Sequence, residues 1–145
     1  MTLTPKSHAS THSGAPYLAR NFKPIEVETT AFDLEVTGRI PEALNGRLLR
    51  IGPNPAGTPD PARYHWFSGS GMAHGLRLRD GRAEWYRSRY VRDAAVVAAL
   101  KYPPLGGPGA GLRDGSVNTN VSSVGGKLYA VAHREALLQS SPIWP

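Results

Sequence analysis

The sequence predicts an all-β fold built from successive antiparallel hairpins. Its 145 residues include 16 glycines and 13 prolines, about a fifth of the chain, which favours short strands and turns over long helices. Asp80-Gly81 and Gly125-Gly126 are two-residue turn signals, and residues typical of strands flank both pairs. The sequence has no sustained alternation of strands and helices, so a parallel sheet is not expected.

Chain length limits the architecture. A chain of 145 residues with 40% hydrophobic residues has an ordinary single-domain length and could bury a core. A propeller blade takes roughly 40 to 50 residues for four strands, so this chain has room for about three blades. Three blades do not close a ring and leave sheet edges unpaired, so a propeller of this sequence would be incomplete.

The composition favours a cytoplasmic protein. The absence of cysteine excludes a disulfide framework and a thiolate metal site, and it fits a reducing compartment. No apolar run approaches the roughly 18 residues that span a bilayer. The first residues, MTLTPKSHASTHSGAPY, lack a hydrophobic stretch of signal-peptide type.

The chain is basic, with a net charge of +6 and a pI of about 10.0, which is a feature of proteins that bind nucleic acids or anionic membranes. Many arginines fall in the central hairpin, but acids are interleaved with them, and a cross-strand pair such as Arg77 with Glu84 would reduce the positive field. We therefore favour a solvated sheet face and expect no nucleic-acid partner. A basic β-protein that binds polyanions is the non-enzymatic alternative, and acidic partners in a longer chain are a third. The arginines are Arg77, Arg79, Arg82, Arg87, Arg89 and Arg92.

Residues 1–20 are expected to form a disordered or loose arm, because they are polar and show no periodicity. His8 and His12 lie four positions apart in this arm. Ordering a mobile tail would cost more free energy than two metal ligands return, so no metal site is predicted there.

Two strands are predicted before the central hairpin. Alternating apolar and polar residues predict a half-buried strand over 32–37. Residues 41–46 form a short helical turn, and residues 47–51 resume as strand. The run 52–55, Gly-Pro-Asn-Pro, is expected to end this strand at once, because proline supplies no ladder donor.

Residues 64–93 are predicted to form the central hairpin, and Asp80-Gly81, which accepts positive φ angles, sets its register. In this register one face carries apolar side chains and the other carries charges. The predicted pairs are Arg79 with Arg82, Leu78 with Ala83, Arg77 with Glu84, Leu76 with Trp85 and His74 with Arg87. The predicted apolar face gathers Leu76, Leu78, Ala83 and Trp85.

The run Ser68-Gly69-Ser70-Gly71 precedes this hairpin. It lacks the spacing and the Lys-Ser/Thr ending of a phosphate-binding Walker loop, and it leads into a strand rather than a helix. We therefore predict a tight turn that packs under aromatic side chains.

The rest of the chain predicts one helix and one more hairpin. Residues 93–100 read as a short helix with Asp93 as its N-cap, which residues 102–104 terminate. Residues 105–115 are expected to be a glycine-rich surface loop. Strands are predicted over 118–121 and 127–131, and no structure is identified after them.

Several motifs occur in an order that resembles the N-terminal part of the carotenoid cleavage oxygenases, a family that includes stilbene-cleaving bacterial enzymes and the retinal-pigment isomerase. The similarity runs from about Tyr17 to about Val131. The motifs are GRIPEALNGRLLRIGPNP at 38–55, HWF at 65–67, MAHG at 72–75, WYRSRYVR at 85–92 and NTNV at 118–121.

The resemblance implies a seven-bladed β-propeller, of which residues 21–131 would be an N-terminal fragment with about three blades' worth of chain. It implies a non-haem Fe²⁺ held by four histidines, which activates O₂ to cleave a conjugated C=C bond into two carbonyl products. The implied substrates are carotenoids, apocarotenoids or stilbenes, delivered through an apolar tunnel. Neutral imidazoles suit Fe²⁺. Peripheral membrane contact and the oligomeric state stay open.

The resemblance places no catalytic, cofactor-binding or metal-binding residue in this chain. In the family the four iron ligands lie on strands after the matched region, so none of the five histidines here takes a ligand position. His65 and His74 belong to the N-terminal motifs, and we interpret them as hydrogen-bonded structural residues. The chain alone is therefore expected to be inactive.

The pattern changes after Val131, and residues 132–145 are expected to be a divergent or truncated tail. Relatives carry a glutamate here that orients an iron-bound histidine, whereas this chain has His133, with Glu135 two residues later. A histidine cannot supply the same anionic acceptor. A truncated, frameshifted or decayed coding sequence, or part of an intact gene, would explain the change. Ser68 and Ser70 also stand where many relatives carry acids.

Overall fold

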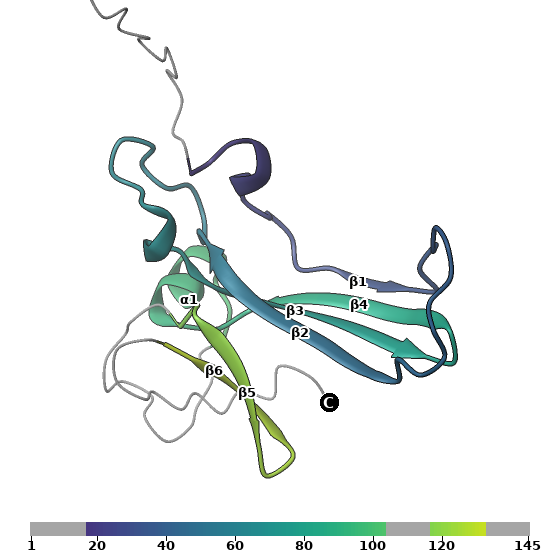
Figure 1. Ribbon diagram of the computed structural model, residues 1–145. Helices are drawn as coiled ribbons and strands as arrows, with labels where there is room; N and C mark the ends of the chain where they lie inside the picture. The colour runs from purple at the N-terminus through teal and green to yellow at the C-terminus, as the bar shows by residue number, and fades with distance from the viewer. Residues whose placement is uncertain (1–16, 104–116, 133–145) are drawn as a thin grey trace, which may run out of the picture.

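The computed structural model of the chain describes residues 17–103 and 117–132, and it confirms a fold made mostly of β-sheet. Figure 1 shows a long four-stranded antiparallel sheet, in the order β1-β4-β3-β2, and a separate hairpin of β5 and β6. The strands are β1 (Thr30–Phe32), β2 (Gly46–Asn54), β3 (Ser70–Arg79), β4 (Arg82–Tyr90), β5 (Asn120–Val124) and β6 (Lys127–Val131). The helical segments are α1 (Ala94–Leu100) and the single 3₁₀ turns η1 (Arg20–Phe22) and η2 (Trp66–Ser68).

Both faces of the four-stranded sheet are covered at one end, where β3 begins (Figure 1). On the first face, Met72 and Tyr90 pack against Val96 of α1. On the second face, Ile51 lies against a buried cluster of Val91, Val117 and Ala130, in which Ala130 belongs to β6. The other end of the sheet, around the β3–β4 turn, extends beyond the helix and the β5–β6 hairpin (Figure 1).

The register of β3 and β4 starts as predicted and then shifts. Asp80 and Gly81 have φ angles of 49° and 71°, and Leu78 pairs with Ala83 as expected. Glu84 is then bulged out of the ladder, so that Arg77 pairs with Trp85. The predicted Arg77–Glu84, Leu76–Trp85 and His74–Arg87 pairs are therefore wrong. Their partners in the structure are Trp85 for Arg77, Tyr86 for Leu76 and Ser88 for His74.

This bulge moves Trp85 to the other side of the sheet. Successive side chains of a strand alternate between faces, so Trp85 shares the second face with Arg77, and Tyr86 lies beside Leu76 on the first. Glu84 still forms ion pairs, with nitrogen–oxygen distances of 3.7 Å to Arg77 and 3.4 Å to Arg79. The predicted apolar face thus loses its largest member.

The first predicted strand, over 32–37, is wrong: β1 lies earlier in the chain, and only Phe32 belongs to both. β1 ends at Phe32 because Asp33 adopts a left-handed φ of 49°, which turns the chain out of the extended conformation. Phe32 is 61% exposed rather than half-buried. The chain stays attached to β4 after the turn, since the Leu34 N–H donates to the Ala83 carbonyl at 3.2 Å.

The second predicted strand is longer than expected. β2 continues through Pro53 to Asn54, and our prediction that it ends at residue 51 is wrong. Among the described strands β2 is an edge, where a proline without an N–H need not break a ladder. The buried side chain of Asn54 binds the backbone of Ile25 with two hydrogen bonds. Its Oδ1 accepts from the Ile25 N–H at 2.8 Å, and its Nδ2 donates to the Ile25 carbonyl at 2.9 Å.

The short helix is confirmed, and so is the second strand of the last hairpin over 127–131. The first strand of that hairpin was predicted over 118–121 and lies at 120–124. Asp93 caps α1 by accepting from the Val96 N–H at 2.8 Å, and Lys101 ends the helix with a left-handed φ of 57°. Gly125 and Gly126 both have positive φ angles at the β5–β6 turn. The predicted loop over 105–115 lies outside the described residues, as does most of the expected arm and tail. No helix in the described ranges is long and apolar enough to cross a membrane.

Gly71 of β3 lies directly against Val117, in the segment that leads into β5. A Cβ at Gly71 would lie 1.9 Å from the Val117 carbonyl oxygen, so Gly71→Ala should force the β5–β6 hairpin away from the sheet. We expect it to lower the free energy of unfolding by about 2 to 3 kcal/mol in urea denaturation.

The matched control is Gly52→Ala on β2, where a Cβ would meet nothing within 4 Å. This variant should unfold within about 0.5 kcal/mol of the parent chain. Equal stability of the two variants would contradict the close contact between the sheets.

Candidate functional site

The two histidines of the N-terminal motifs have different local partners. His65 is exposed and precedes η2, where its Nδ1 accepts from the Phe67 N–H at 3.3 Å. His74 lies on β3, and its Nδ1 is 2.7 Å from the Tyr86 hydroxyl. Burial, together with the positive charge of Arg50, lowers the pKa of His74 below the usual histidine value. His74 shares a face with Leu76 as predicted, but not with Trp85.

The described residues do not form a metal centre. Within residues 17–103 and 117–132, no three or more His, Cys, Asp or Glu side chains gather in a way that could hold a metal ion. His8, His12, His133 and Glu135 lie outside these ranges. The residues in hand therefore do not fit the four-histidine iron site that the sequence resemblance implies.

The predicted tight turn over residues 68–71 is only partly right, because Ser68 ends η2 and Ser70 and Gly71 already belong to β3, so that Gly69 forms the turn between them. A Cβ at Gly69 would lie 2.6 Å from the Tyr64 hydroxyl oxygen, and burial raises the pKa of Tyr64. Ser70 is buried and its Oγ is 3.3 Å from the Asp93 carboxylate. Asn118 crosses from the β5 side and donates to the Gly69 carbonyl at 2.7 Å. This turn therefore joins the two sheets and α1, a structural role.

An aromatic cluster that sequence reasoning missed lies beside this turn. The ring centroids of Phe22 and Trp66 are 5.1 Å apart, and those of His65 and Tyr17 are 5.0 Å apart. Phe67, which stacks on Trp66, is 72% exposed. The contributing segments are separated by more than 40 residues in the sequence and show no shared periodicity, so no local pattern pointed to the cluster.

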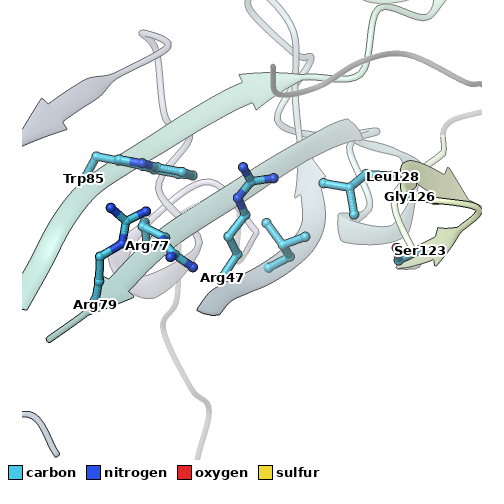
Figure 2. Close-up of a pocket in the computed structure, with 8 residues that line it drawn as sticks. Arg47, Arg77, Arg79, Trp85, Ser123, Gly126 and Leu128 are labelled. Carbon is cyan, nitrogen blue, oxygen red and sulfur yellow. The ribbon is translucent and has the colours of Figure 1, made fainter. Parts of the chain in front are cut away.

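A groove of about 510 Å³ lies between the second face of the four-stranded sheet and the β5–β6 hairpin. Figure 2 shows arginine side chains and Trp85 on the sheet side and Leu128, Ser123 and Gly126 on the hairpin side. The register places Arg47, Arg77 and Trp85 next to one another on neighbouring strands. The groove is lined by Arg47, Leu49, Arg77, Arg79, Trp85, Ser123, Gly126 and Leu128.

The groove carries excess positive charge. Arg77 and Arg79 share the single carboxylate of Glu84, and Arg77 also donates to the Asn45 side-chain oxygen at 3.0 Å. Arg47 has no ion pair or hydrogen bond within the described residues. Three guanidinium groups thus line the groove, Glu84 pairs with two of them, and none of the residues that line the groove is acidic. The alternating arginines of the hairpin were the sequence signal for this site. The bulge at Glu84 is what places Trp85 on the same face as these arginines.

The chain is similar in sequence to a family of known proteins. The family model described as retinal pigment epithelial membrane protein matches residues 22–141. The carotenoid cleavage oxygenase of Mycobacterium tuberculosis is 52% identical over 118 residues, which cover 80% of this chain and 24% of that protein. The family match includes residues 132–141, the first part of the segment that we expected to be divergent.

Solved structures agree with this assignment. The lignostilbene dioxygenase of Pseudomonas brassicacearum superposes with a TM-score of 0.64 at 26% identity, over 90% of this chain and 28% of that one. A cobalt-substituted apocarotenoid oxygenase of Synechocystis superposes with a TM-score of 0.63 at 28% identity, over 80% of this chain and 27% of that one. The chain thus spans about a quarter of the length of these relatives.

The lowered pKa of His74 predicts a pH-dependent stability. The unfolded chain takes up a proton on this histidine as pH falls through its usual value of about 6.5, before the folded chain does. Stability that is present above this pH should therefore decline as pH falls through the lower pKa of the folded state. We expect His74→Asn to flatten the decline in the urea midpoint between about pH 7 and pH 5.

The control is His65→Asn, which removes an exposed histidine in the same motif region. The urea midpoint of this variant should fall with pH as steeply as that of the parent chain. Parallel pH profiles for the parent and His74→Asn would show that His74 is not responsible.

Proposed function

We propose, from the premise that this chain belongs to the carotenoid cleavage oxygenase family, that it forms the N-terminal part of an enzyme that cleaves a conjugated C=C bond with O₂. The family match over residues 22–141 carries this proposal. The mycobacterial relative is named a carotenoid cleavage oxygenase, and the Pseudomonas relative is named a lignostilbene dioxygenase. The proposed substrate class is therefore an apolar polyene or a stilbene, cleaved to two carbonyl products.

In the proposed architecture, the four-stranded sheet is one blade of a seven-bladed propeller and β5–β6 begins another. Two observations support this arrangement. The described four-stranded sheet has the strand number of one blade, whereas the β5–β6 sheet has only two strands. The relatives are about four times as long as the matched segment, which leaves ample chain for further blades.

We propose that Fe²⁺ is the cofactor of the complete enzyme, where it would supply the activation of O₂. Support comes from the family and from the cobalt-substituted relative, whose name shows that a metal ion can be exchanged in it. As the resemblance implies, we propose that the iron ligands belong to polypeptide outside this chain. This chain alone is therefore proposed to be inactive, and no reaction step is assigned to its residues.

The role that we assign to this chain is structural support. Asn54 fixes the segment around Ile25 to the end of β2, and Gly71 and Asn118 hold the β5–β6 hairpin against the sheet. These contacts join segments from residue 25 to residue 118. Contacts of this kind suit the support of an iron site, whose ligands must be held in place by the surrounding protein.

The polyanion-binding alternative is weaker. Ion pairs occupy several of the arginines, including Arg82 with Asp33 at 3.3 Å and Arg89 with Glu28 at 4.0 Å. Binding to DNA that falls steeply between low and moderate salt would favour the alternative, and flat or absent binding would remove it. A cytoplasmic location and the absence of a nucleic-acid partner stay predictions.

Iron titration tests whether the chemistry resides in this chain. The purified 145-residue chain, titrated with Fe(II) without oxygen, should show no tight binding at one ion per chain and no polyene cleavage when air is admitted. Stoichiometric binding with cleavage would overturn the assignment of the iron ligands to other polypeptide.

A chimera tests the family function. The part of the mycobacterial oxygenase that corresponds to residues 22–131, which ends before the position of His133, would be replaced by those residues of this chain. We expect the chimera to cleave carotenoids at a rate within about 10-fold of the parent, because the substituted segment supplies support rather than chemistry. A soluble, iron-loaded chimera without cleavage activity would contradict the proposal.

A further inference from the structure

We propose that the groove between the two sheets is a docking surface for an acidic, extended strand contributed by the rest of the propeller, with a carboxylate of that strand paired to Arg47. This inference rests on the proposed function, because it takes the chain to be part of a longer protein. It assigns the surface by which this part joins the remainder and the chemistry of the segment that would fill it.

The first observation is an unpaired sheet edge beside the groove. β6 pairs only with β5 among the described strands, and a two-stranded sheet alone is marginally stable in water. β5 lies near β2 and pairs with one edge of β6. The opposite edge of β6 has no partner among the described strands. Leu128 of β6 lines the groove. A strand added to that edge would extend the small sheet and cover apolar surface at the groove.

The second observation is the charge of the groove. Three guanidinium groups, on Arg47, Arg77 and Arg79, line the groove, and the carboxylate of Glu84 pairs only with the last two. Covering them with an apolar strand would bury unpaired positive charge, which is costly. An acidic side chain opposite Arg47 would instead form a charge-assisted hydrogen bond. The occupant is therefore expected to carry at least one Asp or Glu.

The third observation is that apolar surface on this face lies uncovered. Phe32 is 61% exposed at the edge of the sheet, directly opposite Trp85 in the β1–β4 register. The Arg87 guanidinium carbon lies 5.0 Å from the centroid of the Trp85 ring. An extended strand that alternates apolar and acidic residues would satisfy both the aromatic and the charged parts of this surface. The relatives have about three quarters of their length outside the matched segment, which could supply such a strand.

A peptide titration tests the chemistry. The probes are three nine-residue peptides that alternate valine with glutamate, glutamine or lysine. Binding is read from Trp85 fluorescence in a Trp66→Phe, Trp144→Phe background and from the amide NMR shifts of β6. We expect the glutamate peptide to bind most tightly and to lose about 10-fold in affinity between 50 and 500 mM NaCl, since salt screens the charge pair.

Arg47→Gln should weaken binding of the glutamate peptide by about 5- to 10-fold, as expected for the loss of one charge-assisted pair. Arg39→Gln is the matched control, because Arg39 is also exposed but pairs with Glu42 in the turn before β2 and does not line the groove. Equal binding of the glutamine peptide, equal effects of the two substitutions, or no binding at millimolar peptide would each overturn the proposal.

The chimera identifies the source of the strand. Arg47→Glu should lower the melting temperature of the full-length chimera more than Arg39→Glu does, while the two substitutions should have similar effects in the chain alone. Equal effects in the chimera would show that the rest of the propeller does not occupy this groove. That result would leave carotenoid cleavage by the chimera unaffected, so failure of this inference is distinguishable from failure of the proposed function.

Discussion

The close approach of Gly71 to the Val117 carbonyl is the contact on which the arrangement of the two sheets depends. It allows the small hairpin to lie on the second face of the large sheet, where Val91, Val117 and Ala130 form a buried cluster. Any side chain at Gly71 would fill this space. Both the cluster and the contact lie at one end of the sheet. In the part of the chain that the structure describes, the opposite end is held by its strand ladders, by surface ion pairs and by contacts such as the Arg77–Asn45 hydrogen bond.

Local chemistry predicted the turns and the helix well. Asp80-Gly81 and Gly125-Gly126 adopt the positive φ angles that their residue types allow, and Asp93 caps α1. Features set by tertiary structure were missed. One is the bulge at Glu84, which shifts the pairing of β3 with β4, and another is the continuation of β2 through Pro53, which an edge strand tolerates. Neither is visible in a single strand's pattern.

The candidate site could be predicted only in part. The motifs around His65 and His74 identified the family, and the arginine alternation of the hairpin anticipated a charged face. The groove itself needs Trp85 beside Arg77, which the bulge produces, and Leu128 from a hairpin more than 40 residues away in the sequence. Long-range packing of this kind has no local signal. The aromatic cluster around Trp66 was missed for the same reason, because its contributing segments also lie more than 40 residues apart in the sequence.

We propose that the uncovered end of the large sheet is an internal surface of a larger propeller. Amide hydrogen exchange of Leu48, which is 62% exposed, and of Leu76 on the neighbouring strand measures this most directly, in the 145-residue chain and in the chimera. We expect at least about 10-fold slower exchange in the chimera, because further blades would cover both faces of the sheet. Equal exchange rates in the two proteins would contradict it, because the chain would then form this surface without a neighbour.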